Sequence, residues 1–272
     1  MEHLGTRRAA AFFDLDKTII ARSSTLAFSR PFYAGGLINR RTVLRSAYAQ
    51  FVYLLGGADH DQMERMREYL SAMCTGWDVQ TVRAIVADTL DHIVDPMIYA
   101  EAVTLIEQHR AAGRDIVIVS SSGAEVVEPI GAKLGADKVI ATRMVVADGK
   151  YTGEISEYAY GPHKATAITA LAAAEGYDLQ ASYAYSDSIT DEPMLAAVGH
   201  PFAVNPDKAL RRLAITRDWP VLDFSKPVAL AERSRFREAR RPAVAAGILG
   251  TVAAAAGVLL YAARRRARPG AS

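Results

Sequence analysis

Two aspartates at the end of a short apolar run are the residues of this sequence best suited to chemistry. Asp14 and Asp16 follow the run 9–13 and are followed by Lys17 and Thr18. Such a run is typical of a buried strand, and open α/β sheets hold their ligands at the carboxyl ends of their strands. One carboxylate could attack an electrophilic atom, and a second one two residues later could transfer a proton.

Further polar residues follow predicted strands or begin a predicted helix. Ser120 ends the apolar run 115–119, Asp187 and Asp191 follow the run 182–185, and Lys164 starts an alanine-rich helix over 164–174. If the strands are parallel, these side chains meet at one edge of the sheet. Each of them alone is common on protein surfaces, and only their order and placement together indicate a site.

Four carboxylates in one place require a cation, because they repel one another and raise one another's pKa values. Magnesium suits them best, since it prefers oxygen ligands and usually takes one or two carboxylates with water and substrate phosphate. Zinc lacks its usual ligands, because His163 has no companion at ligand spacing and Cys74 is the single cysteine. The residues therefore predict Mg²⁺-assisted attack on phosphorus, with hydroxyl and lysine groups binding phosphoryl oxygens.

The elements that must position these residues alternate between strands and helices beyond residue 96. That alternation predicts an α/β fold with a doubly wound, mostly parallel sheet. Between the first strand and residue 95 the periodicity is helical, with apolar stripes over 43–55 and 63–73. We expect a helical insertion over 22–95 between the two parts of a catalytic core, 1–21 and 96–224. Its stripes are predicted to pack as a core, with an apolar ligand pocket as the alternative.

Charge is distributed unevenly along the 272 residues. Of 32 basic and 30 acidic residues, nine arginines and Glu238 lie from position 233 onward, which leaves 23 basic against 29 acidic residues before it. A nucleic-acid-binding domain would carry basic residues on its folded part, so this acidic balance argues against that class. The single cysteine excludes an internal disulfide framework and suits a reducing compartment.

The carboxyl-terminal region predicts a membrane anchor. After an arginine-rich linker over 225–242, residues 243–263 carry no charge for 21 positions, about 31 Å as a helix, and a basic tail follows over 264–272. A buried helix or a surface helix is the alternative. Small residues four positions apart, such as Ala246 and Gly250, could support helix pairing and self-association. Six basic residues before the segment against four after it, and no signal peptide in the first ten residues, predict a single-pass protein of the cell membrane with its catalytic domain in the cytoplasm.

The four motifs in this order resemble those of haloacid dehalogenase superfamily phosphatases, in the branch close to phosphoserine phosphatase. The motif DxDxT is present at 14–18, the hydroxyl after an apolar strand at Ser120, the lysine at Lys164 and the acidic motif at 187–191. The resemblance implies an α/β core with a helical cap over 22–95. It also implies roles for individual residues: nucleophile, Asp14; acid and base, Asp16; phosphate binding, Thr18, Ser120, Ser121 and Lys164; Mg²⁺ binding, Asp14, the backbone carbonyl of Asp16, and Asp187, with Asp191 in support.

Two departures from that branch bear on the substrate. Phosphoserine phosphatases carry a glutamate shortly after the first motif, whereas residues 21–25 contain no acid, and Ser121 stands where glycine is usual. We therefore predict a Mg²⁺-dependent phosphomonoester hydrolase that acts on a phosphoserine-like metabolite or on a lipid phosphate. The alternatives are a membrane-anchored scaffold or regulatory protein with little turnover, and a phosphotransferase.

Overall fold

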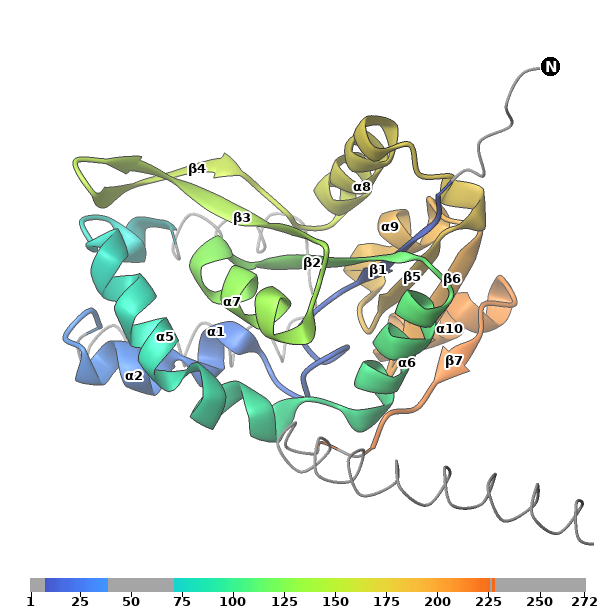
Figure 1. Ribbon diagram of the computed structural model, residues 1–272, viewed down its shortest axis with the longest axis horizontal. Coiled ribbons are helices and arrows are strands. Elements are labelled where there is room, and N and C mark those ends of the chain that lie inside the picture. The colour runs from blue at the N-terminus through green and yellow to red at the C-terminus, as the bar shows by residue number, and fades with distance from the viewer. Residues whose placement is uncertain (1–7, 39–70, 226, 228–272) are drawn as a thin grey trace, which may run out of the picture. The chain divides into compact units, whose positions relative to one another are not determined.

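The computed structural model describes residues 8–38, 71–225 and 227 (Figure 1). The chain divides into two compact units, Met1–Val228 and Ala229–Ser272, and the described residues all belong to the first unit.

A seven-stranded sheet forms the centre of this unit, with the strand order β4-β3-β2-β1-β5-β6-β7. All neighbouring strands are parallel except β3 and β4. This arrangement confirms the predicted mostly parallel α/β sheet. The strands are β1 Ala10–Phe13, β2 Asp115–Gly123, β3 Lys138–Ala147, β4 Lys150–Glu157, β5 Tyr183–Ser186, β6 His200–Val204 and β7 Val221–Leu222.

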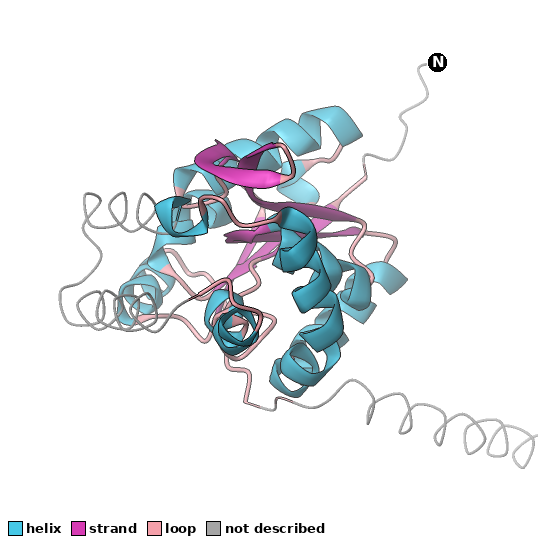
Figure 2. Cartoon of the chain, turned by 90° about the vertical axis from the view of Figure 1, so that its left-hand side faces the viewer, coloured by secondary structure: helices cyan, strands magenta, loops and turns pink. Residues whose placement is uncertain are grey.

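Helices cover both faces of the sheet (Figure 2). The residues of β1 alternate between those faces: Phe12 packs in a cluster that includes Ile168 of α8 and Leu210 of α10, whereas the Phe13 ring contacts His109 of α6. This explains why β1 is apolar throughout, since both of its faces are buried. The described helices are α1 Ser24–Ala27, α2 Ser29–Ala34, α5 Val79–Val94, α6 Ala100–Ala111, α7 Ala124–Leu134, α8 Pro162–Glu175, α9 Glu192–Ala196 and α10 Lys208–Thr216.

Three strands differ from the sequence prediction. The sequence predicts a polar loop directly after the apolar run 115–119, but β2 continues through the serines to Gly123, and its register with β3 shifts between Ser120 and Gly123. The sequence predicts two short strands, one near 139–140 and one at 145–146, whereas β3 is one continuous strand that pairs first with β2 and then with β4. β7 was not predicted, because two residues are too short for a periodic signal. The pair Asp148-Gly149 ahead of residues 151–155 predicts a hairpin with a two-residue turn, and the structure confirms it, with positive φ at both residues.

The two segments that connect the helical insertion to the core are hydrogen-bonded to each other. The Ala21 N–H donates to the Met97 carbonyl at 2.8 Å, and the Tyr99 N–H donates to the Ile19 carbonyl at 2.9 Å. On its other side the insertion meets the β3–β4 hairpin, where the Val79 N–H donates to the Gly149 carbonyl at 2.9 Å. The stripe over 43–55 and most of the stripe over 63–73 lie outside the described residues, and the division into a core and a cap over 22–95 stays a prediction.

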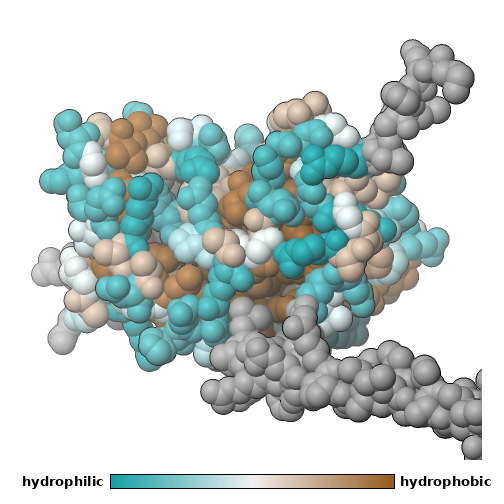
Figure 3. Space-filling view, viewed as in Figure 1, coloured by the Kyte–Doolittle hydropathy of each residue, from teal (hydrophilic) through white to brown (hydrophobic). Residues whose placement is uncertain are grey.

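The predicted anchor, residues 243–263, also lies outside the described residues, as do the linker beyond 227 and the basic tail 264–272. Within the described ranges, no helix is both long and apolar enough to cross a bilayer. On the described part of the face in Figure 3, hydrophilic side chains separate small apolar patches. The large apolar side chains exposed on the described residues are spread over several elements: Leu26, Tyr33, Val146 and Ile215.

A buried histidine under β1 predicts a pH dependence of stability. His109 donates or accepts a hydrogen bond with the Tyr185 hydroxyl at 2.7 Å, and burial beside Arg114 lowers its pKa from 6.5 to about 4. The unfolded chain therefore takes up this proton first, and the free energy of unfolding should fall as the pH drops from about 6.5 to about 4, by about 3 kcal/mol. Urea unfolding at several pH values should show this loss in the wild type and a smaller loss in His109→Phe. The exposed control His92→Phe should keep the wild-type slope, and an unchanged slope in His109→Phe would contradict the assignment.

Candidate active site

Three neighbouring strands bring the predicted residues to one edge of the sheet. Asp14 follows β1, Ser120 lies in the last part of β2, and Asp187 follows β5. All three strands are parallel, so their carboxyl ends point the same way. The Asp14 N–H donates to the Tyr185 carbonyl at 2.9 Å, which fixes the start of the first motif against β5. All three side chains are buried.

Lys164 lies between two of the carboxylates. Its Nζ is 2.6 Å from Asp14 Oδ1 and 2.7 Å from Asp191 Oδ2, and all three side chains are less than a tenth exposed. The local sequence explains this placement: Gly161 has φ 53° ahead of α8, and Pro162 occupies the first turn, where its missing N–H is not needed. Lys164 therefore enters the site from the first turn of α8.

The ionisable side chains around Lys164 shift one another's pKa values. Burial raises the pKa of Asp14 well above its ordinary value against the opposing effect of Lys164, and the carboxylates of Asp191, Asp187 and Asp16 raise it further. Burial also raises the pKa of Asp187 to about 7. Burial alone would lower the pKa of Lys164, but the carboxylates of Asp14 and Asp191 more than reverse this effect. The ammonium is therefore held in its charged form.

A second layer of polar contacts holds the acidic loop after β5. Ser186 Oγ donates to Asp191 Oδ2 at 2.7 Å. The backbone N–H of Asp207 donates to the Asp187 carbonyl at 2.8 Å, and its carboxylate accepts from the Ile189 N–H at 2.9 Å. Asp207 also accepts the Leu210 N–H and so caps α10. The sequence prediction did not include Ser186 and Asp207, although Asp207 is a typical helix-capping residue.

The remaining predicted residues lie in different surroundings. Asp16 is half-buried and accepts hydrogen bonds from the Ser24 N–H and from the Ser122 hydroxyl, two residues absent from the prediction. Thr18 is buried, and its hydroxyl has no hydrogen-bond partner within the described residues. Ser121 is exposed, whereas the neighbouring Ser120 hydroxyl accepts from the Ser122 N–H at 3.2 Å.

The carboxylates of Asp14 and Asp187 offer the kind of oxygen ligand that a magnesium ion prefers. Asp14 Oδ2 and both carboxylate oxygens of Asp187 accept no hydrogen bond from any described residue. Buried carboxylate oxygens that accept no hydrogen bond, one on Asp14 and two on Asp187, are suited to a hard cation that completes its shell with backbone oxygen and water. No group of three or more His, Cys, Asp or Glu side chains among the described residues could hold a metal ion by itself. Asp191 and Asp14 Oδ1 are instead bound to Lys164.

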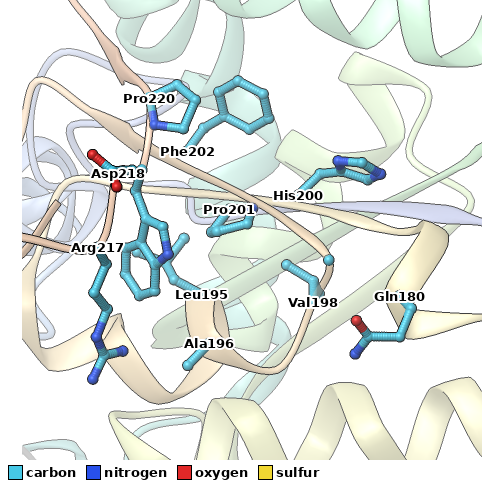
Figure 4. Close-up of a pocket in the computed structure, with 12 residues that line it drawn as sticks. Gln180, Leu195, Ala196, Val198, His200, Pro201, Phe202, Arg217, Asp218 and Pro220 are labelled. Atoms are coloured by element: carbon cyan, nitrogen blue, oxygen red, sulfur yellow. The ribbon is translucent and has the colours of Figure 1, made fainter.

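A pocket of about 540 Å³ lies elsewhere in the molecule (Figure 4). Its lining includes His200 and Phe202 of β6, Pro220 before β7, and Arg217 and Trp219 after α10. His200 begins β6, so this pocket opens near the amino ends of the strands and not at the edge that holds Asp14. It is therefore separate from the cluster described above.

The model of the haloacid dehalogenase-like hydrolase family matches residues 11–196. This range includes the charged residues of the site, which are Asp14, Asp16, Lys164, Asp187 and Asp191. The chain belongs to this family. Membership confirms the predicted resemblance and the prediction that the chain is a hydrolytic enzyme. Phosphatases of this family generally use Mg²⁺.

Relatives within the family carry several names. The chain is 66% identical over 270 residues to the "inhibition of morphological differentiation protein" of Streptomyces azureus, with 98% of each chain covered. It is 60% identical to a probable phosphatase of Mycobacterium tuberculosis, with 95% of this chain and 90% of the relative covered, and 35% identical to a phosphoserine phosphatase of that organism, with 79% and 71% covered. Among solved structures, a Bordetella pertussis protein of unknown function superposes with a TM-score of 0.72 at 28% identity, covering 80% of this chain and 99% of its own.

The contact between Lys164 and its two carboxylates predicts a large effect on stability. Lys164→Met should lower the free energy of unfolding by about 3–5 kcal/mol, because it leaves two buried carboxylates without a cation. Adding Asp191→Asn to this variant should restore part of the loss. The surface pair Lys138–Glu175 provides the control, and Lys138→Met should cost less than about 1 kcal/mol. Urea unfolding in metal-free buffer measures all three, and equal stability of the single and double variants would contradict the prediction.

Proposed function

We propose that the protein is a Mg²⁺-dependent phosphomonoester hydrolase that works through an aspartyl-phosphate intermediate. The observation that carries this proposal is the buried Asp14–Lys164–Asp191 contact at the carboxyl ends of β1 and β5. The family match and the relatives named as phosphatases support it.

Asp14 forms the intermediate in the first step. Its carboxylate oxygen attacks phosphorus, the bond from phosphorus to the ester oxygen breaks, and Asp16 gives its proton to the departing oxygen. Lys164 holds the other oxygen of Asp14 and keeps the nucleophile oriented. Ser120, Ser121 and Thr18 bind phosphoryl oxygens, a role that agrees with the unpartnered buried hydroxyl of Thr18.

Water completes the reaction in the second step. The Asp16 carboxylate takes a proton from a water molecule, whose oxygen attacks phosphorus and breaks the bond to Asp14. Inorganic phosphate leaves, and both aspartates return to their starting forms. Mg²⁺, held by Asp14, the Asp16 carbonyl and Asp187 with Asp191 in support, would offset phosphate charge.

The substrate is proposed from the relatives and from the sequence together. A relative named as a phosphoserine phosphatase supports a small phosphorylated metabolite. The sequence of the insertion, with apolar stripes and no acid over 21–25, supports a lipid phosphate as the second candidate. In both cases we propose that the insertion over 22–95 is the cap that covers the substrate.

A location at the cell membrane is a separate proposal that rests on the sequence alone. The 21 uncharged residues over 243–263 and their flanking arginines would anchor the protein, with the catalytic domain in the cytoplasm and helix pairing as a route to self-association. The full chain should pellet with membranes and resist carbonate extraction, whereas a chain ending at residue 228 should remain in the supernatant. Equal partition of the two chains would overturn this proposal.

The nucleophile is tested by trapping the intermediate. The wild type should release phosphate from monoesters with Mg²⁺ and lose this activity in EDTA, and Asp14→Asn should reduce turnover at least about 1,000-fold. Rapid acid quench and mass spectrometry should find a phosphate adduct on the peptide that contains Asp14, and none in Asp14→Asn. An adduct on another residue would overturn the mechanism. Full biological function of Asp14→Asn with its fold retained would favour the scaffold alternative.

The substrate class is tested on a panel of phosphomonoesters. Phosphoserine, other soluble phosphates and lipid phosphates in mixed micelles should be compared by kcat/KM, with and without an added alcohol. Turnover of soluble esters alone would remove the lipid candidate. Capture of the phosphoryl group by the alcohol in place of water would identify a phosphotransferase.

A further inference from the structure

The Asp16 carboxylate is held at both of its oxygens. The Ser24 N–H donates to Oδ1 at 2.8 Å, and the Ser122 hydroxyl donates to Oδ2 at 3.2 Å. The two donors come from different parts of the chain, 8 and 106 residues away. Together they restrict rotation of the carboxylate about its side-chain bonds.

The Ser122 hydroxyl has a neighbour for each hydrogen bond that it can form. It accepts a hydrogen bond from Ser24 Oγ at 2.8 Å and lies 3.1 Å from Thr25 Oγ1. A hydroxyl offers one proton and two acceptor positions, so with its proton on Asp16 it accepts from both neighbours. Ser24 and Ser122 are buried, at 0% and 5% exposure. Burial strengthens such contacts and makes their loss costly.

We propose that Ser122 and Ser24 are positioning residues that fix the Asp16 carboxyl group for proton transfer. This inference rests on the proposed function, in which Asp16 protonates the leaving group. Neither serine needs to touch the substrate, since both act through Asp16. Proton transfer is sensitive to such alignment, because donor and acceptor must come within hydrogen-bond distance.

The same contacts link the acid to the helical insertion. Ser24 begins α1, the first helix after the connecting segment, whereas Ser122 lies in β2 and its N–H donates to the Ser120 hydroxyl at 3.2 Å. Asp16 is therefore fully held only while the start of α1 rests against the end of β2. The contact of α1 with β2 and the alignment of the acid therefore depend on each other.

Hydroxyl groups suit this position because they can reverse a hydrogen bond. When Asp16 is a carboxylate, Ser122 donates to it. When Asp16 carries a proton, Ser122 can accept that proton's hydrogen bond and donate to Thr25 or Ser24 instead. An ammonium group at this place would favour only the carboxylate. The network therefore serves a residue that acts alternately as acid and base.

Leaving groups of different basicity test the proposal. p-Nitrophenolate departs without a proton, whereas phenolate and especially benzyl alkoxide need one. The value of kcat/KM covers every step up to loss of the leaving group. We expect Ser122→Ala to lower kcat/KM about 10- to 100-fold for benzyl phosphate and less than about threefold for p-nitrophenyl phosphate. Phenyl phosphate should lie between them.

Matched variants separate positioning from a general defect. Ser122→Thr keeps the hydroxyl and should stay within about threefold of the wild type for all three esters. Ser24→Ala keeps the N–H donor and should show a weaker version of the Ser122→Ala pattern. Ser29→Ala removes a hydroxyl at the start of α2 that donates to the exposed Leu26 carbonyl at 2.7 Å, and this variant should match the wild type. If Ser122→Ala does not fold, Ser122→Thr and Ser24→Ala carry the test.

Two outcomes would overturn the proposal. An equal loss for all three esters in Ser122→Ala and Ser24→Ala would show that the serines support the fold or phosphate binding, and no loss would show that Asp16 needs no positioning. Asp16→Asn distinguishes this failure from failure of the proposed function. In Asp16→Asn, kcat/KM should fall more steeply with the basicity of the leaving group than in Ser122→Ala. If it does not, Asp16 is not the acid.

Discussion

The contact of the Lys164 ammonium with two buried carboxylates is the interaction on which the rest of the site depends. Removing three charges from water is costly, and the cost is offset only if the groups meet at hydrogen-bond distance. The three residues come from the end of β1, the first turn of α8 and the loop after β5. The strand order that places β1 beside β5, and the turn at Gly161 that starts α8, are therefore both required for this contact.

The same cluster leaves an excess of negative charge. Lys164 contacts Asp14 and Asp191, and Asp16 has only neutral donors. Asp187 accepts no hydrogen bond within the described residues, although the charge of Lys17 acts on it and opposes the effect of burial on its pKa. Under the proposed function, a phosphate group brings further negative charge, and a bound cation would offset the repulsion that results. The acidic cluster and the proposed magnesium ion are thus two aspects of one electrostatic constraint. Lys164 offsets part of the charge and fixes the orientation of Asp14.

Local patterns predicted the sheet and the strongest chemical residues. The apolar runs before Asp14, Ser120 and Asp187 are short and continuous, as expected for strands buried on both faces, and each ends at a polar residue. The contacts around Asp16 could not be predicted in this way. Ser24 and Ser122 are 98 positions apart, and a serine has the same local preferences whether it faces water or a carboxylate. Only the register of β2 and the course of the chain after β1 bring them together.

The hydrogen bonds between the two connecting segments have an evolutionary consequence. Because residues 19–21 pair with 97–99, the chain closes the core at this point whatever lies between them. Under the proposed division into core and cap, the insertion is then a branch whose length and sequence can vary between this point and its contact with the β3–β4 hairpin. Relatives could thus acquire different substrates by exchanging the branch, provided that its first turn keeps a donor for Asp16. The chain near Ser24 would then separate the part that determines the substrate from the part that carries out the reaction.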